Sequence, residues 1–176
     1  MDQLPHQGAS GAPLRGTPSA LVLEWLVDRA HIADLLVEFA RALDERDWAG
    51  YAATYVEDAE LRIGPGVTLR GRDRIRDATA SDRGLAQYAG TWHGSSNHAV
   101  RIDGDTATSR SYLHGVHLLG GDTFHHADGS GWYDCTLRRT DGLELAGGWR
   151  FVTVQITEVW HAGEPLPHVA RRVEAS

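Results

Sequence analysis

The segment ARALDERDWAGY, residues 40–51, decides how this chain folds, because one amphipathic helix ends in it and a second helix begins. Upstream of this segment, Asp28 stands where a helix N-cap is expected, after a short helical turn at residues 21–27. The pattern predicts a long helix over about residues 28–45 with one apolar face. The members of that face are Ile32, Leu35, Leu36, Phe39 and Leu43.

Asp44 falls at the edge of this apolar face and can therefore point toward the interior. It also lies in the last helical turn, where the partial negative charge of the helix end disfavours a carboxylate. Burial and the helix dipole would both raise its pKa, as a general base near neutral pH requires. An aspartate that only ends the helix and binds the next turn is the alternative, which periodicity alone favours.

The residues after Asp44 begin a second helical pattern. Asp47 is placed to cap this helix, and Trp48, Tyr51 and Tyr55 share one of its faces, an aromatic stripe more typical of core than of pocket. Three further elements are expected before the second half of the chain: a short strand at 59–63, a polar helix at 70–80 and a loop at 81–90.

The second half of the chain has the pattern of a β-sheet. Turn signals of the Asp-Gly and Gly-Gly-Asp type separate consecutive strand-like runs, which predicts an antiparallel, curved meander. Helices first and strands afterwards indicate the α+β class, with the helices covering one face of the sheet. The predicted strands lie at about residues 91–102, 106–119, 130–139 and 149–160.

Composition narrows the range of partners. The chain has 176 residues, with 17 Lys and Arg against 24 Asp and Glu and a formal net charge of −7. Nucleic-acid binders concentrate basic residues on one face, so a nucleic-acid partner is not expected. A single cysteine, Cys135, cannot form an internal disulfide, and in a strand-like run we expect it to be buried and unreactive.

The chain divides into three predicted segments. Residues 1–19 are rich in Gly, Pro, Ser and Ala and are expected to form a flexible arm, residues 20–165 the folded domain, and residues 166–176 a tail. No apolar run approaches the roughly 20 residues of a membrane span, and the N-terminus lacks a signal-peptide pattern. We therefore expect a cytoplasmic protein without a membrane partner.

Histidine is frequent, with 10 residues, and a metal site is the first possibility to test. The pairs His93 with His98 and His114 with His117 are five and three residues apart in predicted strands, so the members of each pair point to opposite faces. Neither a metal nor a cofactor is expected. The chain also lacks the Gly-x-Ser-x-Gly motif and Gly-rich phosphate loops, which leaves acid–base chemistry by an Asp and a His in an apolar pocket.

Three segments together resemble a known family. The runs LVEFARALDERDWAGYAATYVEDAEL, TWHGSSNHAVRIDGDTATSRSYLHGVHLL and GWYDCTLRRTDG, followed by GGWRFVTVQ, are similar to the SnoaL-like branch of the nuclear transport factor two-like superfamily. The resemblance covers about residues 25–160 and is nearest to scytalone dehydratase and bile-acid dehydratase. It implies a cone-shaped α+β barrel in which helices and a curved sheet enclose a cavity, and it implies a homodimer or homotrimer.

The same resemblance suggests which residues are catalytic. In those dehydratases an Asp at the end of the first long helix pairs with a His at the start of the strand after the loop, and these features fall on Asp44 and His93. The nearest match to a second pocket histidine is His114 or His117. The tyrosine that precedes the Asp in scytalone dehydratase is Leu43 here, so its role would pass to another tyrosine: Tyr51, Tyr55 or Tyr112.

The remaining candidate residues would bind substrate. A cavity lined by Phe39, Trp92 and Trp132 would suit a flat, hydrophobic cyclic molecule such as a polyketide, terpenoid or steroid. Asn97 belongs to the His-x-x-x-Asn start of the strand, and Arg150 could anchor an anionic or carbonyl group or face solvent. The predicted function is a cofactor-free dehydratase or isomerase; a non-catalytic binding or accessory subunit, and a cyclase or epoxide-opening hydrolase, remain alternatives.

Overall fold

The computed structural model of the chain describes residues 19–64, 66–120, 123–142 and 144–164. These residues form a long helix, two shorter helices and a six-stranded sheet. The helices are α1 (Ala20–Asp44), α2 (Trp48–Ala53) and α3 (Arg72–Ala80), with short 3-10 turns at η1 (Leu85–Gln87) and η2 (Ala146–Gly148). The strands are β1 (Tyr55–Ile63), β2 (Val67–Arg70), β3 (Gly90–Asp103), β4 (Thr106–Leu118), β5 (His126–Arg139) and β6 (Trp149–Gly163).

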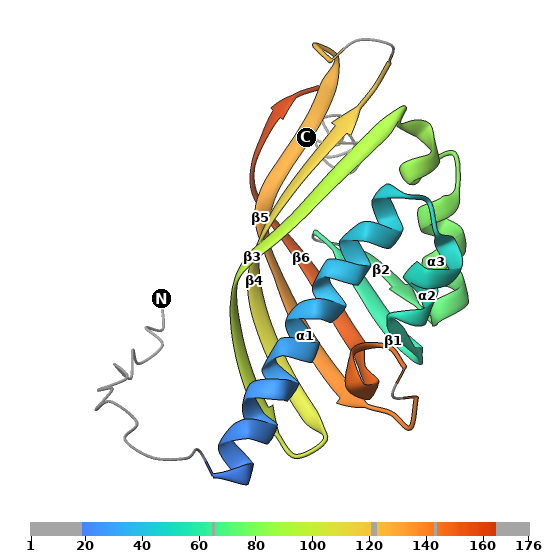
Figure 1. Cartoon of the computed structure of the whole chain (residues 1–176). Helices are drawn as coiled ribbons and strands as arrows, with labels where there is room; N and C mark the ends of the chain where they lie inside the picture. Colours follow the sequence, from blue (N-terminus) through green and yellow to red (C-terminus); the bar gives the residue numbers. More distant parts are fainter. Residues whose placement is uncertain (1–18, 65, 121–122, 143, 165–176) are drawn as a thin grey trace.

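The sheet curves around α1, and α2 and α3 lie on the same side beside β1 and β2 (Figure 1). The strand order is β2-β1-β6-β5-β4-β3, and all neighbouring pairs are antiparallel apart from β1 with β6, which is parallel. The predicted α+β class with a curved sheet and helices on one face is confirmed. The predicted antiparallel meander of the second half is confirmed in β3, β4, β5 and β6. The sheet does not close into a barrel, and the parallel pair of β1 with β6 is the exception to the predicted antiparallel sheet.

The long helix begins earlier than the sequence pattern predicts, at Ala20, because Ser19 is its N-cap and accepts a hydrogen bond from the backbone of Val22. Asp28 is not a cap. It lies inside the helix and is buried, where it accepts hydrogen bonds from Arg139 Nη2 at 2.6 Å and Trp149 Nε1 at 3.2 Å. A buried carboxylate needs such partners, so Asp28 fixes α1 to the β5 and β6 strands.

The core lies between α1 and the concave face of the sheet. The predicted apolar face of the helix is buried, with Phe39 at its centre. The Phe39 ring lies 5.3 to 6.2 Å from four other aromatic rings, those of Tyr51, Tyr55, Tyr133 and Phe151. Each fully buried large apolar side chain contributes about 1.5 to 3 kcal/mol relative to an exposed one, so this cluster holds helix and sheet together.

Two smaller predictions concern Tyr55 and Cys135. Tyr55 is the first residue of β1 and not part of the second helix. Cys135 is buried in the core, and burial raises the pKa of its thiol to about 12, so it stays protonated and unreactive.

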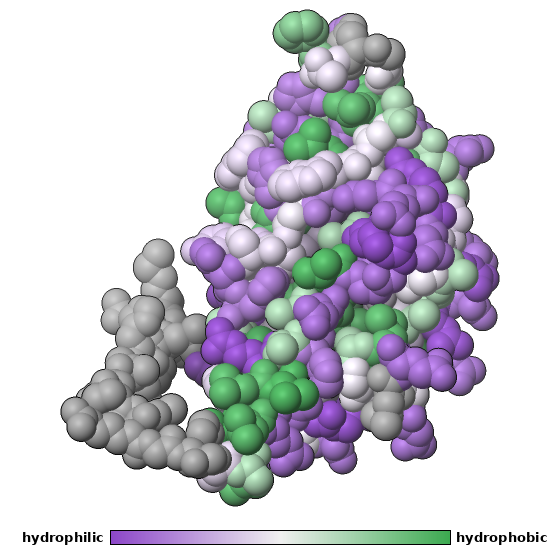
Figure 2. Space-filling model, in the orientation of Figure 1, coloured by the Kyte–Doolittle hydropathy of each residue, from purple (hydrophilic) through white to green (hydrophobic). Residues whose placement is uncertain are grey.

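Figure 2 shows apolar side chains gathered over the N-terminal part of α1, where Leu21, Leu23, Leu26 and Val27 are exposed. None of the helices within the described residues is long and apolar enough to span a membrane. The predicted arm (1–19), apart from Ser19, and the predicted tail (166–176) lie outside the described residues.

Candidate active site

Asp44 and His93 form the centre of the site. Asp44 is the last residue of α1, and its Oδ1 lies 2.7 Å from His93 Nδ1 on β3. The same carboxylate accepts hydrogen bonds from the backbone N–H of His93 at 2.8 Å and from the Thr91 hydroxyl at 2.9 Å. An ionised carboxylate only accepts, so His93 Nδ1 carries the proton, and in the neutral tautomer Nε2 is the acceptor.

The predicted raised pKa of Asp44 is wrong. Burial on its own would raise the pKa, but hydrogen bonds from His93 and Thr91 outweigh that effect and hold the pKa below its ordinary value. Asp44 is therefore ionised at neutral pH, and its geometry suits orienting His93 better than removing a proton itself. It does not bind the following turn either; Asp47 does so, by accepting from the Gly50 backbone at 2.8 Å.

A second histidine, His117 on β4, lies beside His93. The two ring centroids are 5.2 Å apart and the planes meet at 82°. His117 Nδ1 donates to the Ala127 carbonyl at 2.8 Å, so its Nε2 is unprotonated. Burial and the nearby His93 lower the pKa of His117 to about 4, so this imidazole is neutral at neutral pH. Tyr88 also packs against His117, with 4.7 Å between ring centroids.

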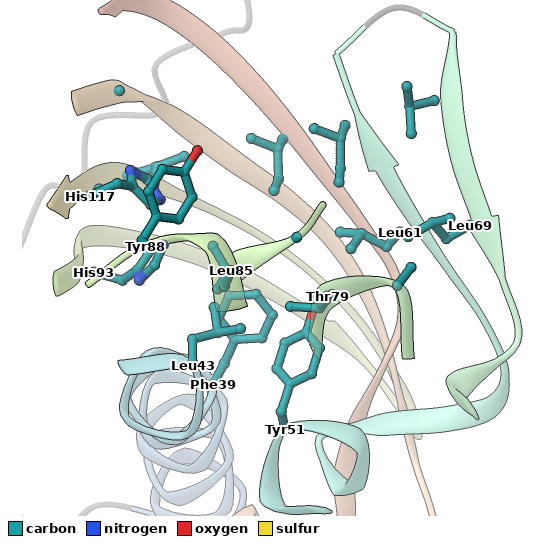
Figure 3. A pocket seen from close by; sticks show the side chains of 18 of the residues that line it. Phe39, Leu43, Tyr51, Leu61, Leu69, Thr79, Leu85, Tyr88, His93 and His117 are labelled. Carbon is teal, nitrogen blue, oxygen red and sulfur yellow. The ribbon is translucent and has the colours of Figure 1, made fainter. Parts of the chain in front are cut away.

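A cavity of about 580 Å³ opens beside these side chains. His93, His117 and Tyr88 lie together at one end, and Leu61 and Leu69 lie at the opposite end (Figure 3). Most of the wall between them is apolar; Tyr51 and Thr79 add hydroxyl groups, and Arg74, Arg83, Gln87 and Glu158 also line the cavity. The other apolar lining residues include Phe39, Leu43, Ile63, Val67, Ala78, Leu85, Leu113 and Ile156. Such a wall with a few polar groups is typical of a site for a small hydrophobic molecule.

Some of the predicted substrate-binding residues lie at this cavity. Phe39, Tyr51 and His117 line it. Tyr55 is buried behind Tyr51, with 3.1 Å between the two hydroxyl oxygens, and does not reach the cavity.

Four predicted residues lie on the outer face of the sheet instead. Successive residues of a strand point to opposite faces, so Trp92 on β3 points away from the face that carries His93. His114 lies on the same outer face as Trp92, with its ring 5.8 Å from the Trp92 ring and its Nδ1 2.5 Å from Ser130 Oγ. Tyr112 and Trp132 are paired across β4 and β5 on this outer face.

The last two predictions are also displaced from the cavity. Asn97 is exposed in a β-bulge of β3, with a φ of 54°. Arg150 donates to the backbone carbonyls of Gly142, Leu145 and Trp149, and so supports the turn before β6. Within the described residues no group of three or more His, Cys, Asp or Glu side chains is arranged to hold a metal ion. That no cofactor is needed stays a prediction.

Sequence reasoning missed Tyr88, Thr91 and Gly115. Thr91 had a detectable signal, because it stands two residues before His93 and therefore on the same face of the strand. Tyr88 lies in a segment without periodicity and gave no signal. Gly115 lies opposite His93, where an added Cβ would be 3.2 Å from the His117 ring and 3.4 Å from the His93 ring. Its missing side chain allows the two imidazoles to approach each other.

Fold and cavity together define an α+β protein in which a helix packs on a curved, open sheet beside a largely apolar cavity. The sequence profile of the SnoaL-like domain matches residues 24–155. The chain belongs to the SnoaL-like family.

The chain is also similar to individual proteins. An uncharacterized protein of Mycobacterium tuberculosis, Rv2910c, is 29% identical over 139 residues, which cover 76% of this chain and 87% of that protein. A candidate scytalone dehydratase from Novosphingobium aromaticivorans is 23% identical, with a TM-score of 0.70 over 83% of this chain and 97% of that chain. The LinA-type3 hexachlorocyclohexane dehydrochlorinase of Novosphingobium barchaimii is 18% identical, with a TM-score of 0.67 over 80% of this chain and 92% of that chain. At these identities the two structures are similar in fold only.

Proposed function

We propose that this protein is a cofactor-independent lyase or isomerase, most simply a dehydratase, for a hydrophobic cyclic small molecule bound in the cavity. The observation that carries the proposal is the Asp44–His93 hydrogen bond at the wall of an apolar cavity. Asp44 fixes the tautomer of His93 and stabilises its protonated form, and His93 Nε2 accepts the proton.

The reaction follows from this arrangement. His93 Nε2 removes a proton from the carbon next to a carbonyl group, and a carbon–carbon double bond forms as the bond to a β-hydroxyl breaks. The proton is returned to the departing oxygen, which leaves as water. His117 is neutral and its Nδ1–H donates a hydrogen bond to the Ala127 carbonyl, so toward the cavity this ring is an acceptor only. The Tyr88 hydroxyl is the donor at this end of the cavity. General acid–base assistance of this kind contributes about 10² to 10⁴ in rate.

A dehydratase-type structure of similar fold supports this reading, as do the Nδ1 hydrogen bonds of both imidazoles, which leave Nε2 as the acceptor of each neutral ring. Isomerisation would use the same first proton transfer and return the proton to another carbon. The hydrogen bond and the empty volume beside it favour an enzyme over a non-catalytic accessory subunit, in which packed side chains would fill that space. A homodimer or homotrimer stays a prediction.

The test begins with the ligand. Mass spectrometry of small molecules that co-purify with the protein gives candidate substrates, and turnover is then measured for Asp44→Asn and His93→Ala. Both variants are expected to lower kcat by about 10²-fold or more, because each removes part of the proton-transfer pair. His98→Ala is the matched control, since His98 lies on the same strand outside the cavity lining. Unchanged turnover in both site variants would refute the proposal.

A further inference from the structure

Arg46 stands at a backbone position that rarely carries a side chain. The end of α1 is closed by hydrogen bonds from Arg46 N to the Leu43 carbonyl at 3.3 Å and from Asp47 N to the Ala42 carbonyl at 2.9 Å. This pair of bonds is the Schellman arrangement, in which the residue at the place of Arg46 has a positive φ and is usually glycine. Arg46 has a φ of 60°. An arginine held in this conformation suggests that its side chain is needed.

The guanidinium of Arg46 reaches three acceptors at the edge of the site. Its Nη1 donates to the Leu43 carbonyl at 3.0 Å and to the Thr91 hydroxyl oxygen at 3.1 Å. Its Nη2 lies 3.4 Å from the Tyr88 carbonyl, and the group stands 5.8 Å from the Trp48 ring. Arg46 does not line the cavity, so it is placed to act through its neighbours and not on a substrate.

These contacts form a closed circuit of residues that includes the proton-transfer pair. A hydroxyl has one proton, and Thr91 gives it to Asp44, so Thr91 accepts from Arg46. Asp44 holds His93, whose ring packs on His117, whose ring in turn packs on Tyr88. The Tyr88 carbonyl returns to Arg46. The same guanidinium therefore supports the carboxylate through Thr91 and the second imidazole through Tyr88.

We infer that Arg46 is a positioning residue of the active site, whose charged, forked side chain fixes Asp44 and Tyr88 relative to each other and thereby sets the two histidines. The expected effect of Arg46 on turnover rests on the proposed function. Its expected effect on the geometry of Asp44 and His93 is independent of that function. Lysine cannot replace it fully, because one ammonium nitrogen cannot occupy the places of two guanidinium nitrogens.

The sharpest variant is Arg46→Gly. Glycine is favoured at this backbone position, so the helix end is kept and the melting temperature should change by only a few degrees, while the side-chain contacts are lost. Loss of the nearby positive charge and of the support for Thr91 should move the midpoint of the Asp44 carboxyl titration, followed by carbon NMR, to higher pH. The proton on His93 Nδ1 should shift upfield as its hydrogen bond to Asp44 loosens. With a substrate in hand, kcat should fall about 10- to 100-fold, since small misplacements of reacting groups have effects of this size.

Two further variants separate charge from geometry. Arg46→Lys keeps the charge, so the midpoint pH of the Asp44 titration should lie close to that of the unchanged protein. Its turnover should lie between that of the glycine variant and that of the unchanged protein. Thr91→Val removes the hydroxyl that joins Arg46 to Asp44 and should raise the same midpoint. If Arg46→Gly does not fold, these two variants decide the question in its place.

The control is Arg41→Gln, which removes ion pairs to Glu38, Glu45 and Asp47 at the same junction. Arg41 and these three partners are not part of the closed circuit of residues that contains Arg46. It should leave the Asp44 midpoint and the His93 proton unchanged. The inference fails if Arg46→Gly, or Thr91→Val in its place, leaves both NMR signals as they are. If the signals move but His93→Ala is fully active, the positioning role of Arg46 is supported and the proposed function is wrong.

Discussion

At the scale of single residues, the chemistry depends on which nitrogen of each imidazole carries a proton. Asp44 fixes the proton on His93 Nδ1, and the Ala127 carbonyl fixes it on His117 Nδ1. In its neutral form each ring then has an unprotonated Nε2, and burial and the nearby His93 lower the pKa of His117 to about 4, which keeps that ring neutral at neutral pH. The two histidines differ in what stabilises a positive charge: His93 has a carboxylate partner, and His117 has a neutral carbonyl. His93 is therefore the ring suited to accept a proton.

The lowered pKa of His117 makes folding stability depend on pH. Its ordinary pKa is 6.5 and its folded pKa about 4, so between these values the unfolded chain binds a proton that the folded chain does not. Stability should therefore fall as the pH drops from about 6.5 to 4, by an amount on the order of 3 kcal/mol from this residue. Urea unfolding at several pH values measures it. His117→Asn keeps a donor for Ala127 but does not titrate, and its stability should depend less on pH in this window; an equal dependence would contradict the assignment.

At the scale of elements, the site is built where α1 ends against β3 and β4. The carboxylate comes from the helix, and both histidines come from the concave face of two paired strands. In the register of that pair, His93 stands opposite Gly115. A residue without a side chain at this position allows the rings of His93 and His117 to lie close together.

A methyl group at residue 115 should disturb the two rings. The added Cβ of Gly115→Ala would lie 3.2 Å from His117 and 3.4 Å from His93, so at least one ring has to move by a few tenths of an ångström. Turnover should fall about tenfold or more, with a smaller effect on the midpoint of thermal unfolding. Gly90→Ala on β3 is the matched control, because its Cβ would make only an ordinary contact, 3.6 Å from Leu118. Equal activity of both alanine variants would show that ring spacing is not critical.

Asp28 determines how firmly α1 is held on the sheet. Burial on its own raises its pKa, but hydrogen bonds from Arg139 and Trp149 and the charge of Arg139 bring it below the ordinary value of 3.8. Its stabilising effect is therefore complete above about pH 4 and is lost as the pH falls through the lower, folded value.

Asp28→Ala should lower the free energy of unfolding by about 3 kcal/mol, because it leaves the Arg139 charge and the Trp149 N–H without their partner. Chemical denaturation at pH 7 measures the change. Asp34→Ala, an exposed position on the same helix, should alter stability by less than about 0.5 kcal/mol. Similar losses for the two variants would mean that the buried pair does not hold the helix.

At the scale of the whole molecule, the sequence pattern predicted the α+β class, the three helices ahead of the four-stranded meander, and most strand positions. It did not predict that β1 lies parallel to β6, because that pairing joins strands that begin at Tyr55 and Trp149 and leaves no local signal. The Asp44–His93 contact was expected from the family resemblance. Hydrophobicity misplaced Trp92 and Trp132, and the search for a replacement tyrosine misplaced Tyr112, because the outer face of this sheet also carries aromatic side chains; Trp92 and Tyr112 are more than half exposed.

The central claim is that His93, held by Asp44, transfers a proton to and from a molecule in the cavity. Mass spectrometry of deuterium uptake tests it most directly, with the co-purified ligand or a confirmed substrate incubated with the protein in heavy water. The protein should introduce deuterium at the carbon next to the carbonyl group of the substrate, or of its product, and His93→Ala should slow this at least a hundredfold while His98→Ala does not. Uptake that is equally fast with His93→Ala would contradict the claim.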